Sequence, residues 1–518
     1  MIEELDFLRL KISEKKKGGQ DMAILEEPIK EVLILKNYIN GEWVESKSEQ
    51  SLDVINPATL ETLAKVPMST REEVNAAVAA AKRAFPEWRR TPPPVRARYL
   101  FKLKSLLEEN LEELARVQTQ EHGRIISESR GAVGRGIECV EVATEIPSLM
   151  MGYNLHNITS GVDEILFYDP LGAFCNIAPF NFPFMVPLWF APLALATGNS
   201  FIVKPSPNTP ISLSWFTKLL EEVNLPPGVW NLVQGGVEAS LALLEHPDIV
   251  GVTFVGSTKV GRDVIYKKCG ETGKRAIVQT SAKNYIIVMP DANLEETIPY
   301  LIPSFFGNTG QRCLSGANLL IVGKDNAFYN KVLNMFVDAA SKITVGSGLD
   351  ESVGMGPMNS ADGKKRVLGY IAKGMEEGAK LILDGRKPNI VGDYPDTCFL
   401  NPTIFEGVTT DMTIGREEIF GPVVSVMRAK DLDEAIKMVN SSRYGNGVCI
   451  FTASGKAARA VQFNTQCGNI GINISIPCTM MWFPFCGMKD SFFGTEHGQG
   501  REAIRFFTDS RVVTQRWT

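Results

Sequence analysis

The sequence predicts an α/β protein of two domains, each built on a mostly parallel sheet, with a separate β arm. Three observations predict it. Between about residues 172 and 290, short apolar segments alternate with amphipathic ones in a βαβα order, which is typical of a parallel sheet covered on both faces. A second α/β block follows residue 290. Residues 145–168 and 503–518 fit neither block, and as unpaired strands they could form an arm at a subunit interface.

The composition limits the class of protein. The 518 residues are 44% hydrophobic and 22% charged, which is ordinary for a globular chain with room for more than one domain. The net charge of -5 gives no reason to expect nucleic acid or a membrane surface as partner, and no run of about 18 apolar residues suggests a membrane span. The 9 cysteines are scattered singly and no metal-ligand spacing accompanies them. We therefore expect a cytoplasmic protein without a metal.

The individual elements follow along the chain. Residues 1–36 read as a charged N-terminal extension. Two overlapping capping boxes, Ser69 with Glu72 and Thr70 with Glu73, predict the start of an amphipathic helix. Strands are expected at 200–205, 230–235, 251–257, 275–280, 318–323 and 422–429, and helices at 210–223, around 241–246 and from Ser257–Thr258 onward.

The segment "GNTGQRCLSG" at 307–316 raises the question of chemistry. Cys313 stands behind Arg312 in a stretch with three glycines. A free cysteine is often only a small buried hydrophobe. The alternative is a thiolate nucleophile, because a neighbouring cation or helix N-terminus can lower the pKa of a thiol.

Four further segments are weak signals when each is taken alone. In "FVGSTKVG", Gly256 turns the chain and Ser257–Thr258 open a helix whose start could hold a phosphate. Ordinary helix capping is the favoured explanation of this segment alone, and the spacing is not GxGxxG. In "VKPSP", Lys204 ends a strand, where doubly wound folds bind ligands. In "APFNFPF", Asn181 could donate to an oxyanion or simply form a turn. In "EEIFGPV", Glu418 could be a surface acid.

Together and in this order, these segments resemble the aldehyde dehydrogenase superfamily over about residues 37–518. The resemblance implies that Cys313 is the nucleophile and that Asn181 forms the oxyanion hole with the main-chain N–H of Cys313. It implies a dinucleotide-binding domain at 37–144 and 165–285, a catalytic domain at 286–487, and an oligomerisation arm at 145–164 and 488–518. It also implies cofactor contacts from Ala178, Phe180, Lys204, Pro207, Gly256, Ser257, Thr280, Glu418 and Phe420.

The departures from the family pattern point to one branch. Gln279 stands where hydrolytic members carry a Glu base, and an amide cannot take a proton from water. The following "AKN" and "MPDAN" resemble the CoA-acylating methylmalonate/malonate-semialdehyde dehydrogenases. In that branch Arg135 and Arg312 would bind a substrate carboxylate, although Arg135 could equally be a surface salt bridge. Pro207 replaces the branch's usual Glu, which leaves the choice between NAD and NADP open, and the Leu314–Ser315 pair also differs from the branch.

We therefore expect NAD(P)-dependent oxidation of malonate or methylmalonate semialdehyde through a thioester on Cys313. CoA would be the cosubstrate and acetyl-CoA or propionyl-CoA the product. The alternatives are a hydrolytic semialdehyde dehydrogenase that gives a free acid and, more remotely, a catalytically silent binding protein on the same fold. The arm predicts a homodimer or homotetramer.

Overall fold

The structure is a computed structural model that describes residues 24–517 of the chain. Its first domain is built around a twisted eight-stranded sheet. The strand order is β24-β12-β11-β8-β9-β10-β2-β3, in which β12 to β10 are parallel and β24, β2 and β3 run antiparallel to their neighbours. The strands are β2 (Asn37–Ile39), β3 (Glu42–Val44), β8 (Ala173–Ile177), β9 (Ser200–Lys204), β10 (Trp230–Leu232), β11 (Ile249–Val255), β12 (Arg275–Gln279) and β24 (Phe492–Gly494). The chain runs outward from β8 to β10 and then returns to β11 on the other side of β8. The crevice between the ends of β8 and β11 is therefore the topological switch point at which such sheets bind ligands.

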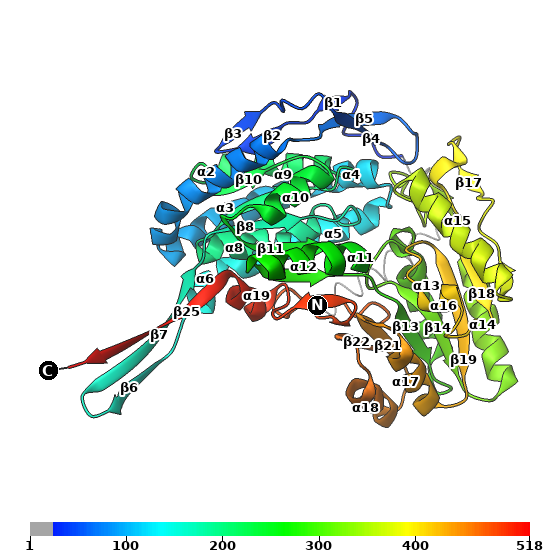
Figure 1. Cartoon of the computed structure of the whole chain (residues 1–518). Coiled ribbons are helices and arrows are strands. Elements are labelled where there is room, and N and C mark those ends of the chain that lie inside the picture. The colour runs from blue at the N-terminus through cyan, green and yellow to red at the C-terminus, as the bar shows by residue number, and fades with distance from the viewer. Residues whose placement is uncertain (1–23, 518) are drawn as a thin grey trace.

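Helices cover both faces of this sheet (Figure 1). One hydrophobic cluster joins α2, α10 and α12 to one face, and another joins α3, α4, α5, α8, α9 and α19 to the other. The helical segments are α2 (Arg71–Arg90), α3 (Pro93–Glu109), α4 (Leu111–His122), α5 (Ile126–Thr144), α6 (Ile146–Leu149), α7 (Met185–Leu188), α8 (Ala191–Thr197), α9 (Ile211–Val223), α10 (Val237–Glu245), α11 (Thr258–Val260), the π-helical η1 (Gly261–Tyr266), α12 (Lys267–Thr272) and α19 (Gly500–Phe507).

The start of α2 shows how local sequence sets an element. The side chain of Thr70 accepts from the main-chain N–H of Glu73, and the Glu73 carboxylate accepts from the main-chain N–H of Thr70, so this capping box is confirmed. Ser69 forms no box because its hydroxyl bonds to Asn37 on β2 instead.

The second domain contains a seven-stranded sheet in the order β16-β18-β19-β14-β13-β21-β22, parallel except for β16. Two hydrophobic clusters pack α13 and α14 on one face and α15 to α18 on the other. The strands are β13 (Asn284–Val288), β14 (Gly316–Val322), β16 (Lys380–Leu383), β18 (Thr403–Glu406), β19 (Val423–Ala429), β21 (Gly447–Phe451) and β22 (Asn469–Ile472). The helical segments are α13 (Leu294–Phe306), η2 (Gly307–Gly310), α14 (Asn326–Ser341), α15 (Ala361–Glu376), η3 (Asp396–Cys398), α16 (Thr413–Arg416), α17 (Leu432–Ser441) and α18 (Gly455–Asn464).

Small sheets join the remaining segments to these two bodies. A three-stranded sheet has the order β1-β5-β4, and two further pairs are β15 with β17 and β20 with β23. These strands are β1 (Leu33–Ile34), β4 (Ser51–Ile55), β5 (Thr62–Pro67), β15 (Val345–Gly346), β17 (Ile390–Val391), β20 (Tyr444–Gly445) and β23 (Met488–Lys489).

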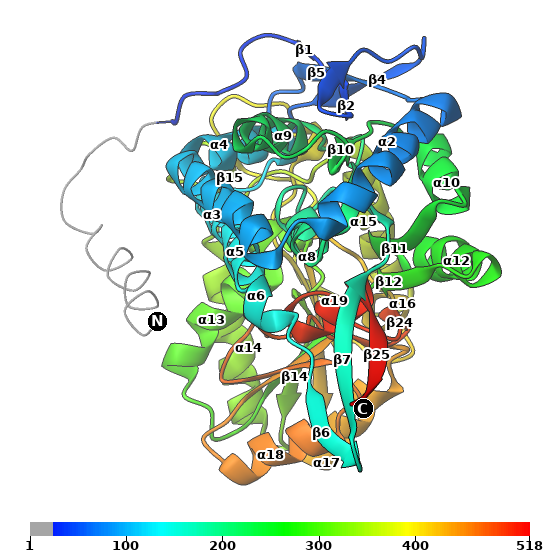
Figure 2. The ribbon, with the colours of Figure 1, turned by 90° about the vertical axis from the view of Figure 1, so that its left-hand side faces the viewer.

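A three-stranded arm of β6 (Asn154–Thr159), β7 (Val162–Pro170) and β25 (Thr508–Arg516) projects from the first domain. Figure 2 views it from its own side of the molecule. Apolar side chains remain exposed on it, including Phe167 at 48% and Val512 at 59%. Monomeric proteins rarely leave such strands uncovered, so the arm has the character of an association surface.

The C-terminal boundary of the arm differs from the expected 488–518. Residues 492–494 form β24 on the edge of the first sheet, and residues 500–507 form the helix α19, whose Phe506 and Phe507 are buried beside α8. The aromatic pair suggested a strand, but it lies on the apolar face of an amphipathic helix. The first arm segment also differs from the expected 145–164, because residues 146–149 form the helix α6 with Ile146 in the core of the first domain. The arm strands run from Asn154 to Pro170.

The expected N-terminal extension lies partly outside the described residues, which begin at 24. The part that is described packs on the body. Ile29 exchanges main-chain hydrogen bonds with the side-chain amide of Gln120, at 3.0 and 2.9 Å, and is buried with Leu35. Within residues 24–517, none of the helices combines the length and apolar character that crossing a membrane requires.

Candidate active site

A cleft of about 970 Å³ lies where the loops after β8 and β11 meet the second domain. Ten of the residues that the sequence singled out line this cleft. They are Ala178, Phe180, Asn181, Pro207, Gly256, Ser257, Thr280, Cys313, Glu418 and Phe420. The switch point of the first sheet and the segment that carries the candidate nucleophile therefore meet in one cavity.

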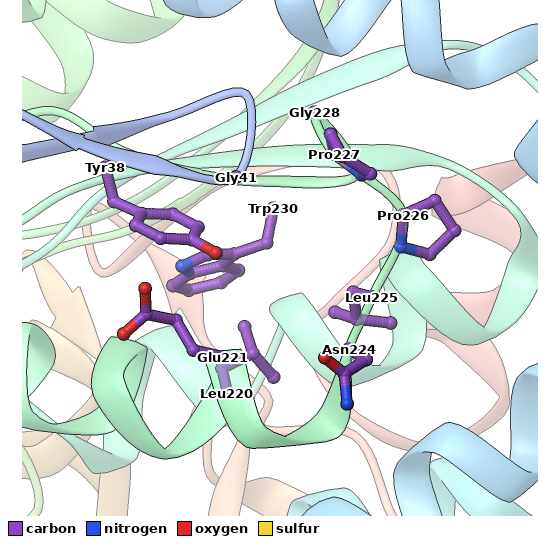
Figure 3. A pocket seen from close by; sticks show the side chains of 10 residues that line it. All are labelled: Tyr38, Gly41, Leu220, Glu221, Asn224, Leu225, Pro226, Pro227, Gly228 and Trp230. Carbon is purple, nitrogen blue, oxygen red and sulfur yellow. The ribbon is translucent and has the colours of Figure 1, made fainter.

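A second surface pocket, of about 490 Å³, lies beside the β2–β3 hairpin and the end of α9 (Figure 3). Tyr38 and Trp230 form its aromatic walls, and Glu221 supplies its one charged side chain. It contains none of the residues predicted to carry chemistry.

The loop that carries Cys313 has a restricted backbone. Asn308 and Thr309 both adopt φ 53°, and Gly310 has φ +70° with the carbonyl of Gly421 so close that a Cβ could not fit. The carbonyl of Cys313 accepts from the side-chain amides of Asn284, at 2.8 Å, and Asn446, at 2.9 Å. The nucleophile loop is thus fixed from β13 and from the start of β21.

The thiol of Cys313 is protonated in the resting cleft at neutral pH. Burial raises its pKa to about 12, and Cys478 and Glu418 act in the same direction. Arg312 and the main-chain N–H of Leu314 lower the pKa, but by less than burial raises it. The neighbouring cation alone does not produce a thiolate, so the site needs a proton acceptor or a bound ligand that changes the environment.

Asn181 is 5% exposed and follows β8 in the loop beside Cys313. Its side-chain amide donates to the carbonyl of Gln311 at 3.0 Å. Its own main-chain carbonyl accepts from Arg124, which also lies 4.5 Å above the ring of Phe182. This network holds the amide next to the nucleophile loop, and an amide in that place can donate to a developing oxyanion.

The predicted cofactor residues lie along the first-domain side of the cleft. Ser257 caps α11 and accepts from the main-chain N–H of Val260 at 3.4 Å. Gly256 lies against the ring of Phe254, where a Cβ would clash. Phe180 and Phe420 meet edge to face, with ring centroids 5.9 Å apart. A helix start that opens into a cleft lined by two aromatic rings suits a dinucleotide.

Glu418 and Lys204 are both more buried than surface residues would be. Glu418 accepts from the main-chain N–H of Ala282 at 2.8 Å, and burial raises its pKa. Lys204 is 3% exposed and donates to the carbonyls of Pro205, at 2.6 Å, and Gly235, at 3.0 Å. It does not line the cleft as the other nine predicted cofactor and oxyanion residues do, so its contact with a ribose stays a prediction.

Gln279 ends β12 and is 3% exposed. Its amide donates to the carbonyl of Phe485 at 2.7 Å. The side chain that stands in the place of a general base is therefore an amide engaged with the main chain.

The charges of the two arginines both act on Cys478. Arg135 on α5 is ion-paired with Glu138 at 2.8 Å, and Arg312 with Glu128 at 3.3 Å. Both cations lower the pKa of the Cys478 thiol, and Cys478 in turn raises the pKa of Cys313. Arg312 lines a small cavity together with Cys313, whereas Arg135 lines neither that cavity nor the main cleft. Binding of a substrate carboxylate by the two arginines stays a prediction, as does the alternative that Arg135 is a salt-bridge residue.

Sequence reasoning missed Cys478, Asn446 and Arg124. Cys478 comes from the segment after β22 and Asn446 from the turn before β21, both far from Cys313 in the chain. No local motif marks them. The "AKN" segment did contain Asn284, but its bond to the Cys313 carbonyl depends on the pairing of β13 with β14.

Comparison with known proteins agrees with this geometry. The model of the family described as "Aldehyde dehydrogenase family" matches residues 43–513. The chain belongs to the aldehyde dehydrogenase family. The fold class, two α/β domains with mostly parallel sheets, is confirmed. The roles of Cys313 as nucleophile and Asn181 in the oxyanion hole stay predictions.

Several relatives share most of the length of this aldehyde dehydrogenase. A malonate-semialdehyde dehydrogenase from Geobacillus kaustophilus is 46% identical over 94% of this chain and 98% of its own. One from Bacillus velezensis is 47% identical over the same shares. A crystal structure of methylmalonate-semialdehyde dehydrogenase from Oceanimonas doudoroffii has a TM-score of 0.91 at 39% identity, covering 94% of this chain and 99% of its own. A Sinorhizobium meliloti structure assigned to the same activity, in complex with NAD, has a TM-score of 0.92 at 36% identity, over the same shares.

Proposed function

We propose that this aldehyde dehydrogenase oxidises malonate or methylmalonate semialdehyde with NAD or NADP and transfers the acyl group to CoA. The names of the relatives support this substrate class. The observation that carries the acylating part is Gln279, whose buried amide is bonded to Phe485 where a hydrolytic enzyme needs a carboxylate.

The first step is attack of the Cys313 thiolate on the aldehyde carbon. The oxyanion that forms accepts hydrogen bonds from the second N–H of the Asn181 amide and from the main-chain N–H of Cys313. Loss of one such donor typically costs about 3–4 kcal/mol in the barrier. NAD or NADP bound along Gly256, Ser257 and Glu418 supplies the hydride acceptor, and the acyl group remains on Cys313 as a thioester.

Arg135 and Arg312 would bind the carboxylate of the substrate. A guanidinium donates in pairs to two oxygens, and both side chains are largely removed from solvent, with 30% and 17% exposed. Their present partners, Glu138 and Glu128, would share or release them when the substrate enters.

The thioester then needs an acceptor. Attack of water on the thioester requires a base, and the side-chain amide of Gln279 cannot act as one. A thiol such as CoA takes the acyl group with less help, because its thiolate forms more easily than hydroxide. When the acyl group is malonyl-like, loss of carbon dioxide gives an enolate that the thioester carbonyl stabilises, and protonation gives the acetyl or propionyl group.

The choice of nucleotide follows from the edge of the cleft. Pro207 lines the cleft and carries no charge. Lys259, Arg262 and Asp263 line it too, and Arg262 is ion-paired with Asp263 at 2.7 Å. No carboxylate at position 207 repels a 2′-phosphate, so NADP should be tolerated beside NAD.

The test is a burst experiment with malonate semialdehyde, with and without CoA. Without CoA we expect about one NADH per active site and then a slow phase, which CoA accelerates. Gln279→Glu should raise the CoA-independent rate. Equal steady-state rates with and without CoA, with a free acid as sole product, would contradict the acylating mechanism and favour the hydrolytic one.

The arm and the cysteines support two further parts of this proposal. The exposed apolar side chains of β6, β7 and β25 suit a homodimer or homotetramer, which light scattering of the purified protein would test. All nine cysteines are unpaired, as suits a reducing cytoplasm.

A further inference from the structure

A small void adjoins the main cleft and shares Cys313, Glu418 and Phe420 with it. Its volume is about 20 Å³, and its walls come from the segment before β13, the nucleophile loop and the loop before β19. Lys283, Cys313, Ser315 and Glu418 are among its lining residues. A cavity of at least about 10–15 Å³ with several polar walls can hold one water molecule.

Two polar atoms of this void have no hydrogen-bond partner within the described part of the chain. They are the Nζ of Lys283 and the Oγ of Ser315, in residues that are 3% and 6% exposed. A buried amine and a buried hydroxyl are costly when they are left unpaired. One water between them would satisfy both.

Lys283 and Cys313 line the same void, and both chain neighbours of Lys283 bond to groups of the active site. The main-chain N–H of Ala282 donates to Glu418 at 2.8 Å. The side chain of Asn284 donates to the carbonyls of both Cys313 and Ser315, each at 2.8 Å. Lys283 therefore lies between the residue that anchors Glu418 and the residue that anchors the nucleophile loop.

We propose that Lys283 accepts the thiol proton of Cys313 through one water molecule held by Lys283 and Ser315. The S–H bond breaks as its proton passes to the water oxygen, and the water gives one of its own protons to the Nζ of Lys283. The water is unchanged, and the products are a thiolate and an ammonium, so the total charge stays the same. Lys283 thus supplies a proton acceptor for the thiol, and as an ammonium it then cannot take a proton from water at the thioester.

The charges around the void are compatible with this step. Burial lowers the pKa of Lys283 to about 7, while Glu418 and Glu417 act in the opposite direction. Arg312 is the other charged side chain at the void, and Cys313 is the group that gives up the proton. A substantial neutral fraction of Lys283 exists near neutral pH, and that fraction falls as the pH drops below about 7. The thiolate–ammonium pair is a minor species, which attack on an electrophile removes as it forms.

The test measures the reactivity of the Cys313 thiolate by alkylation, so it requires neither an aldehyde nor CoA. Cys313 is alkylated with iodoacetamide between pH 5 and 10, and modification of the Cys313 peptide is followed by mass spectrometry. The proposal rests on Cys313 being the nucleophile of the proposed function, but an enzyme that hydrolyses its thioester would give the same alkylation profile. A failure of the CoA experiment and a failure of the relay are therefore distinguishable.

The wild-type rate should rise through a step near pH 7, with the pKa of Lys283. Lys283→Met should lose this step, and its alkylation rate should instead rise steadily with pH, as expected for an isolated thiol with a raised pKa. Ser315→Ala should keep the midpoint and lose about fivefold in rate, as expected for one hydrogen bond. Lys218→Met, an exposed lysine on α9, is the matched control and should react as the wild type does.

A wild-type profile in Lys283→Met would overturn the proposal. So would a step near pH 7 that persists in Lys283→Arg, because a guanidinium stays charged there and cannot give rise to that step. If thermal unfolding shows that the Lys283 variants do not fold, Ser315→Ala decides, and an unchanged alkylation rate in that variant refutes the relay.

Discussion

Replacing Arg312 with Leu should impair the enzyme selectively toward carboxylated aldehydes. The Arg312 side chain is 17% exposed and lies next to Cys313 in the chain. Its guanidinium now meets Glu128 at 3.3 Å and the carbonyl of Pro303 at 3.5 Å. A substrate carboxylate would compete for the same donors.

The magnitude follows from these contacts. A hydrogen bond to a charged group is worth about 1.5–3 kcal/mol. Because Glu128 already holds part of the guanidinium, we expect a net loss near the lower half of that range, about 2 kcal/mol, or about 30-fold in kcat/KM. The loss should lie mainly in KM, since the carboxylate is bound equally in the ground state and the transition state.

The assay compares malonate semialdehyde with propanal, following NADH formation at saturating CoA. Propanal has no carboxylate, so its kcat/KM should change by less than about threefold. The double variant Arg312→Leu with Glu128→Gln controls for the acid that would be left unpaired, since Glu128 also accepts from the main-chain N–H of Asn308 at 2.8 Å. Equal losses for both aldehydes would refute the carboxylate-binding role and leave Arg312 as a structural residue.

Two further predictions concern the nucleophile and the cofactor. Cys313→Ala should abolish aldehyde oxidation and leave nicotinamide-nucleotide binding nearly intact by calorimetry, and more than a few per cent residual turnover would point to another nucleophile. Pro207→Glu should shift the preference toward NAD by about 1 kcal/mol or more, measured as the ratio of kcat/KM values for the two nucleotides. A native enzyme that already rejects NADP by several orders of magnitude would contradict the reasoning about Pro207.

The parts of the fold that depend on local pattern could be read from the sequence. The strands expected at 200–205, 251–257 and 275–280 are β9, β11 and β12, because a buried parallel strand is a short apolar run with turn residues at its ends. The capping box at Thr70 is likewise a local device. Residues 503–507 were misjudged as strand because aromatic residues favour both a strand and the apolar face of a helix, and only packing against α8 decides between them.

The site residues could likewise be predicted only in part from the sequence. Cys313, Asn181 and Glu418 stand in recognisable segments, and the structure brings all three to one cleft. The resting state of the thiol could not be read from the sequence, since it depends on burial and on Cys478, more than 150 residues further along the chain. The role proposed for Lys283 could not be predicted either, because no local sequence pattern shows that its amine is buried without a hydrogen-bond partner in the described structure.

The strand β24 has a consequence for synthesis on the ribosome. It pairs with β12 and completes the edge of the first sheet, yet the entire second domain is translated between the two strands. At about 5–20 residues per second, a nascent chain would wait roughly 10–40 s with Ile277 and Val278 of β12 at an open edge. Phe506 and Phe507, which fill the core beside α8, would arrive later still. A chain that is released from the ribosome before residue 492 is translated would therefore contain a first domain with an unpaired, apolar sheet edge. Chaperones and proteases recognise surfaces of this kind.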